Sequence, residues 1–221
     1  MIDNQDFEAY ARLKPFNYDV NHLWANSFDA ALKLTGRTLN ELKILDYGCG
    51  DGKYFPYFVS KGIRKEMIFG LEVSHERALR CQKIGWENVA LIESGSFLQF
   101  EDNTFDIINF MEVIEHIPEG MGRRTINELS RVLRPNGVML ISTPNYPIKR
   151  YYDFSDALFH KKWERLRDDP THVTFYSYKG LKKLLSDHFK LVILKPFKPG
   201  YLYKHLPLPL FLHKLFFIYQ K

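Results

Sequence analysis

Short apolar runs alternate with longer amphipathic stretches through most of the chain. The apolar runs, rich in β-branched and aromatic residues, predict strands at residues 42–48, 67–73, 89–93, 105–111, 138–143, 190–197 and 215–220. The amphipathic stretches between them predict helices at residues 53–61, 74–84, 121–133 and 179–188. Strands that alternate with helices at this spacing are typical of a doubly wound α/β fold.

We therefore expect a Rossmann-like, seven-stranded and mainly parallel sheet with helices on both faces. The last strand is expected to lie antiparallel between its neighbours, because the chain ends on apolar residues. Residues 1–40 carry apolar side chains at helical spacing and predict an N-terminal helical cap beside the domain formed by residues 41–221. Residues 145–174, rich in aromatic and charged side chains, are expected to form an irregular insert.

Composition excludes several protein classes. The 221 residues are 45% hydrophobic and 26% charged, which is typical of one folded globular domain and excludes disordered and collagen-like chains. The two cysteines are too few for a disulfide framework, and the chain starts without a secretory signal pattern. We expect a cytoplasmic protein with no membrane-spanning helix.

The net charge of +5 is unevenly distributed. Residues 171–221 contain nine Lys and one acidic residue, whereas the first 170 residues carry a net charge of −3. A basic C-terminal part suits RNA, anionic lipid, an acidic substrate or simply solvent. The apolar run at residues 206–219 is too short and too often interrupted to cross a membrane, but it suits peripheral contact with a membrane surface.

A glycine-rich loop follows the first predicted strand. Its sequence is Asp46-Tyr-Gly-Cys-Gly-Asp-Gly52, a spacing that differs from the dinucleotide fingerprint and lacks the Lys of a phosphate loop. Glycines at the carboxyl end of a strand let the backbone approach a ligand closely. Glu72 closes the second strand, where its carboxylate can accept hydrogen bonds from ribose hydroxyls.

This ordered set resembles class I S-adenosylmethionine-dependent methyltransferases from about residue 42 onward. The segments that carry the resemblance are Ile44–Gly52, Gly70–Ser74, Phe100–Asp106, Met111–His116 and Leu133–Gly137. The resemblance implies that S-adenosylmethionine is the cofactor, with its methionine part near the glycine loop and its ribose at Glu72. The residues implied for cofactor binding are Asp46, Gly48, Cys49, Gly50, Glu72, Val73, Gly95, Ser96, Phe97 and Met111.

Transfer of a methyl group to a hydroxyl requires alignment and a group that removes the proton. Glu112, Glu115 and His116 follow the fourth strand, and a helical turn there would place them on one face. These three are the candidate catalytic residues, with His116 as general base. With His172 they form a candidate four-ligand site for Mg²⁺, Mn²⁺, Zn²⁺ or Co²⁺. The alternative roles are cofactor binding or helix capping for Glu112 and a structural hydrogen bond for His116.

The Glu-x-x-Glu-His pattern is similar to that of two branches of the family. One branch contains ubiquinone-biosynthesis and sugar O-methyltransferases, and the other contains small-RNA 3′-end 2′-O-methyltransferases. The RNA branch usually follows its downstream His with Phe-Glu-Trp-Thr-Arg, whereas this chain has Val173-Thr-Phe-Tyr-Ser177. We therefore expect a hydroxyl on a sugar, a glycan or another small polar acceptor. The alternatives are an RNA 3′-end methyltransferase and an inactive methyltransferase-like binding module.

Overall fold

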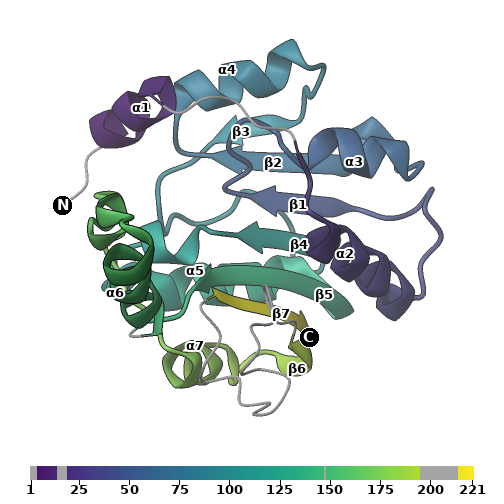
Figure 1. The fold of residues 1–221 in the computed structure, drawn as a ribbon. Coiled ribbons are helices and arrows are strands. Elements are labelled where there is room, and N and C mark those ends of the chain that lie inside the picture. The colour runs from purple at the N-terminus through teal and green to yellow at the C-terminus, as the bar shows by residue number, and fades with distance from the viewer. Residues whose placement is uncertain (1–3, 14–18, 147, 195–213) are drawn as a thin grey trace.

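One seven-stranded mixed sheet lies at the centre of the protein (Figure 1). The structure, a computed structural model, describes residues 4–13, 19–146, 148–194 and 214–221. The strands are β1 (Ile44–Tyr47), β2 (Ile68–Glu72), β3 (Val89–Leu91), β4 (Phe105–Met111), β5 (Leu133–Pro144), β6 (Lys190–Leu194) and β7 (Lys214–Gln220). Their order is β3-β2-β1-β4-β5-β7-β6, and only β7 runs antiparallel to its neighbours. The predicted fold class is therefore confirmed.

Alternating side chains along the strands build two apolar cores, one on each face of the sheet. Leu45 and Ile108 belong to one core, while the neighbouring Ile44 and Ile107 belong to the other. The helices that cover the two faces or lie at the sheet edge are α1 (Asn4–Leu13), α2 (His22–Thr35), α3 (Phe55–Ser60), α4 (His75–Lys83), α5 (Glu119–Val132), α6 (Ile148–His160) and α7 (Tyr178–Leu185). Helices α5 and α7 contribute to the first core, and α2 and α3 to the second.

Local sequence signals set the ends of these helices. Ser74 caps α4, since its Oγ accepts a hydrogen bond from the backbone N–H of Arg77 at 3.3 Å. Gly85 follows the helix with a φ of +80°, a conformation that favours glycine and ends the helix. The predicted helix at residues 74–84 is thus confirmed together with its cap and its stop.

The insert at residues 145–174 is not irregular, which corrects the expectation from its composition. It contains α6 and a short 3-10 helix, Trp163–Leu166, that packs against α6. Helix α6 buries Asp153 and Ala157 and exposes most of its large apolar side chains. Its pattern therefore does not show the buried apolar stripe by which a core-facing helix is recognised.

The ends of the chain also differ in part from expectation. Residues 215–219 of β7 are buried between β5 and β6, so this part of the apolar run at residues 206–219 belongs to the core and not to a membrane-facing surface. Residues 206–213 lie outside the described part of the chain. Helix α2 packs on β4 and β5, whereas α1 lies near α4 at the carboxyl edge of the sheet (Figure 1). Among the described residues, no helix is both long and apolar enough to span a bilayer.

Candidate active site

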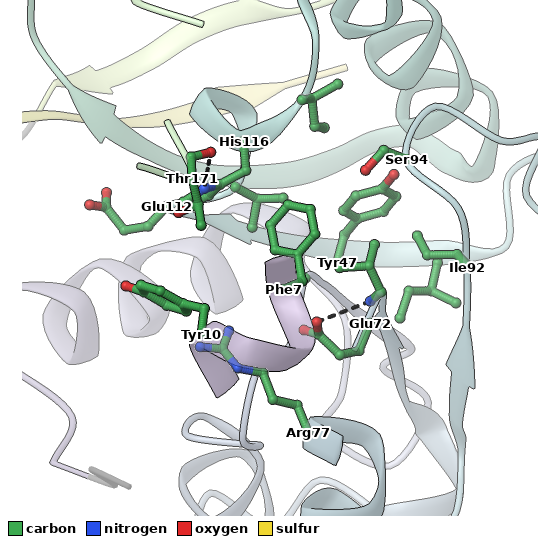
Figure 2. Close-up of a pocket in the computed structure, with 15 residues that line it drawn as sticks. Phe7, Tyr10, Tyr47, Glu72, Arg77, Ile92, Ser94, Glu112, His116 and Thr171 are labelled. Carbon is green, nitrogen blue, oxygen red and sulfur yellow. Dashed lines mark hydrogen bonds between the residues drawn. The ribbon is translucent and has the colours of Figure 1, made fainter. Parts of the chain in front are cut away.

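A cavity opens at the carboxyl ends of β1, β2 and β4 (Figure 2). Between β1 and β4 the strand order reverses, which is where open α/β sheets bind ligands. The cavity encloses about 580 Å³ of space, part of it open to solvent. It is lined by Phe7, Tyr10, Tyr47, Gly48, Leu71, Glu72, Val73, Arg77, Ile92, Ser94, Glu112, Val113, His116, Ile117 and Thr171.

The glycine loop forms one wall of the cavity and is tied to β2. The backbone N–H groups of Gly48 and Cys49 donate to the Leu71 carbonyl at 2.8 and 3.0 Å. Gly48 has a φ of +72°, and a Cβ on it would lie 2.4 Å from a methyl carbon of Val113. Only glycine fits this position, because any side chain would be strained and would also clash.

Glu72 is buried at the end of β2 with its carboxylate held by backbone groups. One oxygen accepts from Gly50 N–H at 2.8 Å, and the other accepts from the N–H groups of Val73 and Ser74 at 3.0 Å each. Burial raises the pKa of this carboxyl, while the three backbone hydrogen bonds act in the opposite direction. The side chain is therefore oriented before any ligand arrives.

Asp46 lies beneath the loop at the end of a chain of hydrogen bonds. The Trp24 indole N–H donates to Asn109 Oδ1 at 2.8 Å, and Asn109 Nδ2 donates to Asp46 Oδ1 at 2.7 Å. The second carboxylate oxygen of Asp46 is buried and has no partner among the described residues. Burial, with the nearby Glu72, raises the pKa of Asp46 to about 7. A cationic ligand group would satisfy this oxygen and stabilise the charged form.

His116 lines the opposite side of the cavity with a defined tautomer. Its Nδ1 lies 2.9 Å from the Thr171 carbonyl oxygen, which can only accept, so we assign the ring proton to Nδ1. Nε2 is then the nitrogen able to take a proton. Burial lowers the pKa of His116, which keeps the ring neutral at pH 7.

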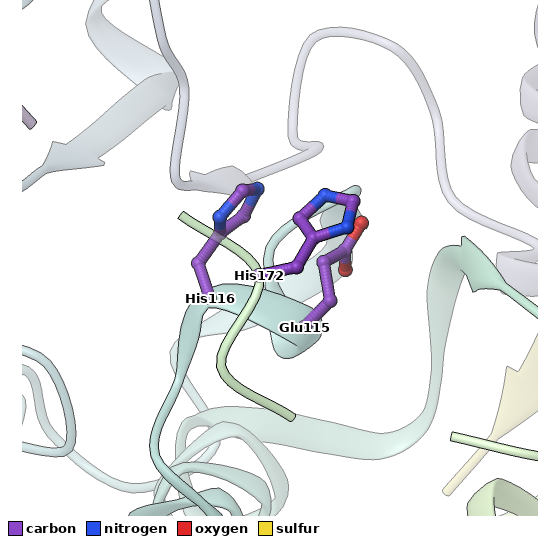
Figure 3. Close-up of side chains that lie close together, drawn as sticks. All are labelled: Glu115, His116 and His172. Carbon is purple, nitrogen blue, oxygen red and sulfur yellow. The ribbon is translucent and has the colours of Figure 1, made fainter. Parts of the chain in front are cut away.

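Glu115, His116 and His172 come together beside the cavity (Figure 3). Their potential ligand atoms all lie within 4.8 Å of one another. The Glu115 carboxylate is buried, and neither oxygen accepts a well-formed hydrogen bond from the residues that the structure describes. Burial and the nearby Glu112 hold the pKa of Glu115 well above its usual range. The donor set of one carboxylate and two imidazoles suits a divalent cation.

Glu112 does not join this cluster, in contrast to the four-ligand site expected from the spacing. It has a φ of +57°, and the 3-10 helix Ile114–His116 starts only after it, so no helical turn aligns Glu112 with Glu115. Its carboxylate accepts from Ser142 Oγ at 2.5 Å and pairs with Lys214 Nζ at 2.6 Å. Glu112 thus lines the cavity while being held by β5 and β7.

Several residues expected to bind a cofactor do not line this cavity. Gly95, Ser96 and Phe97 follow β3, but the residues from that segment that reach the cavity are Ile92 and Ser94. The Phe97 ring is exposed and lies 4.4 Å from the Arg131 guanidinium.

Cys49 and Met111 also lie outside the cavity lining. The side chain of Cys49 is buried in the core that includes Cys81, and Met111 packs against the same core. Both residues were expected to bind the cofactor because Cys49 lies in the glycine loop and Met111 lies at the end of a predicted strand. That placement does not determine which way a side chain points.

Helix α1 contributes residues that the glycine motif could not reveal. Phe7 and Tyr10 face the cavity from one side of α1 (Figure 2). Glu8 accepts from Ser74 Oγ at 3.1 Å and from the backbone N–H groups of His75 and Glu76 at 2.5 and 3.2 Å, at the start of α4. The Tyr10 hydroxyl donates to Asp169 at 2.8 Å. The only sequence signal was the spacing of Phe7 and Tyr10 on a predicted helix.

Comparison with protein families identifies the chain. A family model described as "Methyltransferase domain" matches residues 16–189, a span that includes the glycine loop, Glu72 and the His116 region. This chain belongs to the methyltransferase domain family. The resemblance to class I S-adenosylmethionine-dependent methyltransferases seen in the sequence is thereby confirmed.

Curated relatives of this methyltransferase domain protein include ubiquinone biosynthesis O-methyltransferases. The protein from Paraburkholderia xenovorans is 29% identical over 157 residues, which cover 66% of this chain and 60% of the relative. The protein from Rickettsia akari is 31% identical over 115 residues, covering 52% of this chain and 45% of the relative. The chain thus spans about half of the length of the relatives it matches.

Solved structures of methyltransferases share the fold. A SAM-dependent methyltransferase from Archaeoglobus fulgidus has a TM-score of 0.67 at 18% identity, with 97% of this chain and 98% of that chain covered. Magnesium protoporphyrin IX methyltransferase from Synechocystis PCC 6803, solved with bound SAH, has a TM-score of 0.63 at 14% identity, covering 98% and 94%. At these identities the similarity shows the fold alone.

The buried carboxyl of Asp46 gives a testable pH dependence of stability. Its pKa is raised from 3.8 to about 7, so the folded state favours the protonated form. Its contribution to folding is therefore complete below the pKa of 3.8 that the group has in the unfolded chain, and it is lost as the pH rises from there through about 7. Asp46→Asn, which keeps the acceptor for Asn109 and removes the charge, should raise the melting temperature of the ligand-free protein by several degrees at pH 8.

At pH 5 the same substitution should raise the melting temperature clearly less than at pH 8, because only part of the interval between the pKa of 3.8 in the unfolded chain and about 7 in the folded protein has then been crossed. Thermal unfolding of both proteins at the two pH values measures the difference. Asp51→Asn, at a partly exposed carboxylate paired with Arg80, is the control and should gain no stability at pH 8. Equal effects of Asp46→Asn at both pH values would show that Asp46 titrates normally.

Proposed function

We propose that the protein transfers the methyl group of S-adenosylmethionine to a hydroxyl oxygen of a small polar acceptor, such as a sugar or a glycan. The observation that carries this proposal is the pairing of a cofactor-type glycine loop with His116, whose Nε2 is the ring nitrogen available to accept a proton. Relatives named as O-methyltransferases support oxygen as the acceptor atom. The activity, the acceptor and the cofactor sites are parts of this proposal.

In this proposal the ends of β1 and β2 bind the cofactor. The Glu72 carboxylate would accept hydrogen bonds from the ribose hydroxyls. The unpartnered oxygen of Asp46 would accept a hydrogen bond from the amino group of the methionine part. S-adenosylmethionine supplies an electrophilic methyl group on a sulfonium ion. The Asp46 carboxylate suits a cationic group, because one of its oxygens is buried and has no partner among the described residues.

His116 acts as general base on the acceptor. As the acceptor oxygen bonds to the methyl carbon, the carbon–sulfur bond breaks and the hydroxyl proton passes to Nε2. The Thr171 carbonyl accepts a hydrogen bond from Nδ1–H of His116, and this bond would stabilise the imidazolium that forms. Phe7 and Tyr10 of α1 cover the same space and would exclude water from it.

A divalent cation is a further part of the proposal. Glu115, His116 and His172 would hold it, and Mg²⁺, Mn²⁺ or Zn²⁺ would supply Lewis-acid assistance to an acceptor hydroxyl. The buried Glu115 carboxylate without well-formed hydrogen bonds supports this assignment, because a cation would compensate its charge. With a cation bound, His116 would be a ligand, and without one it would be the base.

An RNA 3′ end is a second candidate acceptor. The nine lysines among residues 171–221 favour it, since phosphate contacts require cations. The inactive binding module is disfavoured, because Gly48, Gly50 and Glu72 all keep the contacts that a cofactor loop needs.

Replacement of His116 tests the assignment of the base. We expect His116→Ala to lower turnover by a factor of ~10²–10⁴ while the affinity for S-adenosylhomocysteine, measured by calorimetry, stays the same. Turnover is measured as transfer of radiolabelled methyl into host extract separated into glycan, RNA, lipid and small molecules. Label in RNA that nuclease removes would favour the RNA acceptor.

The matched control is His188→Ala, at an exposed histidine that contacts Asn127. It should behave as the wild type in both measurements. Unchanged turnover in His116→Ala would contradict the role of His116, and lost S-adenosylhomocysteine binding in that variant would point to a structural role.

The proposed cation site has a readout that does not depend on activity. Mn²⁺ should raise the melting temperature of the wild type, because a ligand that binds only the folded state stabilises it. Glu115→Gln should abolish this increase and should stabilise the metal-free protein at pH 8, since it removes a buried uncompensated carboxylate. Differential scanning fluorimetry with Mn²⁺ and with EDTA measures both effects.

Glu119→Gln, at an exposed carboxylate on the first turn of α5, serves as the control and should keep the full response to Mn²⁺. A wild type that is indifferent to Mn²⁺, or a Glu115→Gln protein that responds like the wild type, would contradict the cation site. His116 would then act without a metal ion.

A further inference from the structure

Helix α6 has its apolar side chains on the outside. Tyr151, Phe154, Leu158 and Phe159 are 71%, 61%, 53% and 74% exposed, whereas the charged Asp153 is 5% exposed. Trp163, in the 3-10 helix that follows, is 61% exposed. Adjacent exposed aromatic side chains of this kind mark interaction surfaces rather than ordinary solvent-facing helices.

The exposed side chains share one face. Tyr151, Phe154 and Leu158 are spaced three and four residues apart, so they lie along one stripe of α6, with Phe159 beside it. The 3-10 helix Trp163–Leu166 packs against α6 and adds Trp163 and Leu166 to the exposed residues. We call Tyr151, Phe154, Leu158, Phe159, Trp163 and Leu166 the α6 face.

Ion pairs on the inner side fix the orientation of α6. Lys149 Nζ lies 2.5 Å from Asp153 and 3.2 Å from Asp168, and Arg150 also pairs with Asp168. The Tyr146 hydroxyl reaches the same Asp168 at 3.4 Å. The pair between Lys149 and Asp153 lies within α6, but rotation of α6 to bury its aromatic side chains would break the pairs that Lys149 and Arg150 form with Asp168. These pairs therefore favour the outward position of the apolar face.

The uncompensated charges around the α6 face are mainly basic. Residues 148–169 contain six Lys or Arg and five acidic residues, and four of the acidic side chains, Asp153, Asp156, Asp168 and Asp169, have partners within the protein. Asp153 is paired with Lys149, and Asp156 with Arg165. Within the described part of the chain, no carboxylate forms an ion pair with Lys161, Lys162 or Arg167. Exposed aromatic and aliphatic side chains beside unpaired cations are typical of segments that lie in the interface of an anionic membrane.

We propose that the α6 face docks onto an anionic lipid bilayer. Charge complementarity favours this occupant over a second copy of the chain, which would bring the same cations to the contact. Helix α6 lies at the carboxyl edge of the sheet, on the side where α1 covers the cavity (Figure 1). Docking would therefore bring the side of the protein that carries the cavity close to the bilayer. The proposal does not depend on the methyltransferase activity.

Vesicle binding of the full chain tests the proposal. We expect the wild type to co-sediment with vesicles of phosphatidylcholine and phosphatidylglycerol at 7:3, much less with pure phosphatidylcholine, and less again in high salt. The double variant Phe154→Ser/Phe159→Ser should reduce binding at least about tenfold, because it removes two large aromatic side chains that would bury apolar surface in the bilayer interface. Lys161→Glu/Lys162→Glu should reduce binding to the anionic vesicles specifically.

Tryptophan fluorescence gives a second measurement of the same event. Trp24 and Trp86 are fully buried, so a change of emission on addition of vesicles reports on Trp163. A blue shift with anionic vesicles is expected for the wild type and should disappear in Trp163→Ser. The control variants are Leu91→Ser, at an exposed apolar residue on the edge strand β3, and Lys83→Glu, at an exposed residue on α4.

Circular dichroism and the melting temperature verify that each variant folds, as expected for exposed positions. Failure of the wild type to bind anionic vesicles would overturn the proposal, as would unchanged binding of the Phe154→Ser/Phe159→Ser protein. A concentration-dependent dimer that this double variant dissociates, without vesicle binding, would assign the α6 face to self-association instead.

Discussion

The hydrogen bond between Asn109 and Asp46 joins the parts of the protein on which the site depends. It connects the carboxyl ends of β1 and β4, the two strands between which the sheet order reverses. The Trp24 indole extends the connection to α2, so a helix far from the cavity orients the carboxylate beneath the glycine loop. Because Asn109 and Trp24 are fully buried, the chain of donors has little freedom to rearrange.

Two buried carboxylates, those of Asp46 and Glu115, lack compensating partners among the described residues. Asp46 and Glu115 are buried, each keeps unpartnered oxygens, and both have raised pKa values. An isolated folded protein gains nothing from such groups, since each costs free energy of desolvation. A cationic ligand near Asp46 and a divalent cation near Glu115 would convert the same groups into binding determinants. Under the proposed function, these carboxylates would thus lower the stability of the ligand-free protein and raise its affinity for the ligands.

The sequence was sufficient for the sheet and for the cofactor loop because both follow local rules. The span of β4 was predicted to the residue, and Ser74 and Gly85 marked the ends of α4. The placement of Glu112 could not be predicted, because its left-handed backbone results from contacts with β5 and β7, which are distant in sequence. Helix α6 was missed for a related reason, since ion pairs of Lys149 and Arg150 with Asp168, and not a buried apolar stripe, hold its orientation.

The segment of residues 168–172 links the insert, the N-terminal helix and the proposed base. Asp168 forms ion pairs with Lys149 and Arg150 of α6. Asp169 accepts a hydrogen bond from the hydroxyl of Tyr10 in α1. Asp169 also accepts from the backbone N–H of Thr171, whose carbonyl sets the tautomer of His116. Helices α6 and α1 thus both contact the segment whose Thr171 carbonyl accepts the hydrogen bond of His116 Nδ1. The insert is a structural part of the site, because without it Nδ1 of His116 would lose its partner and the choice of tautomer would be left open.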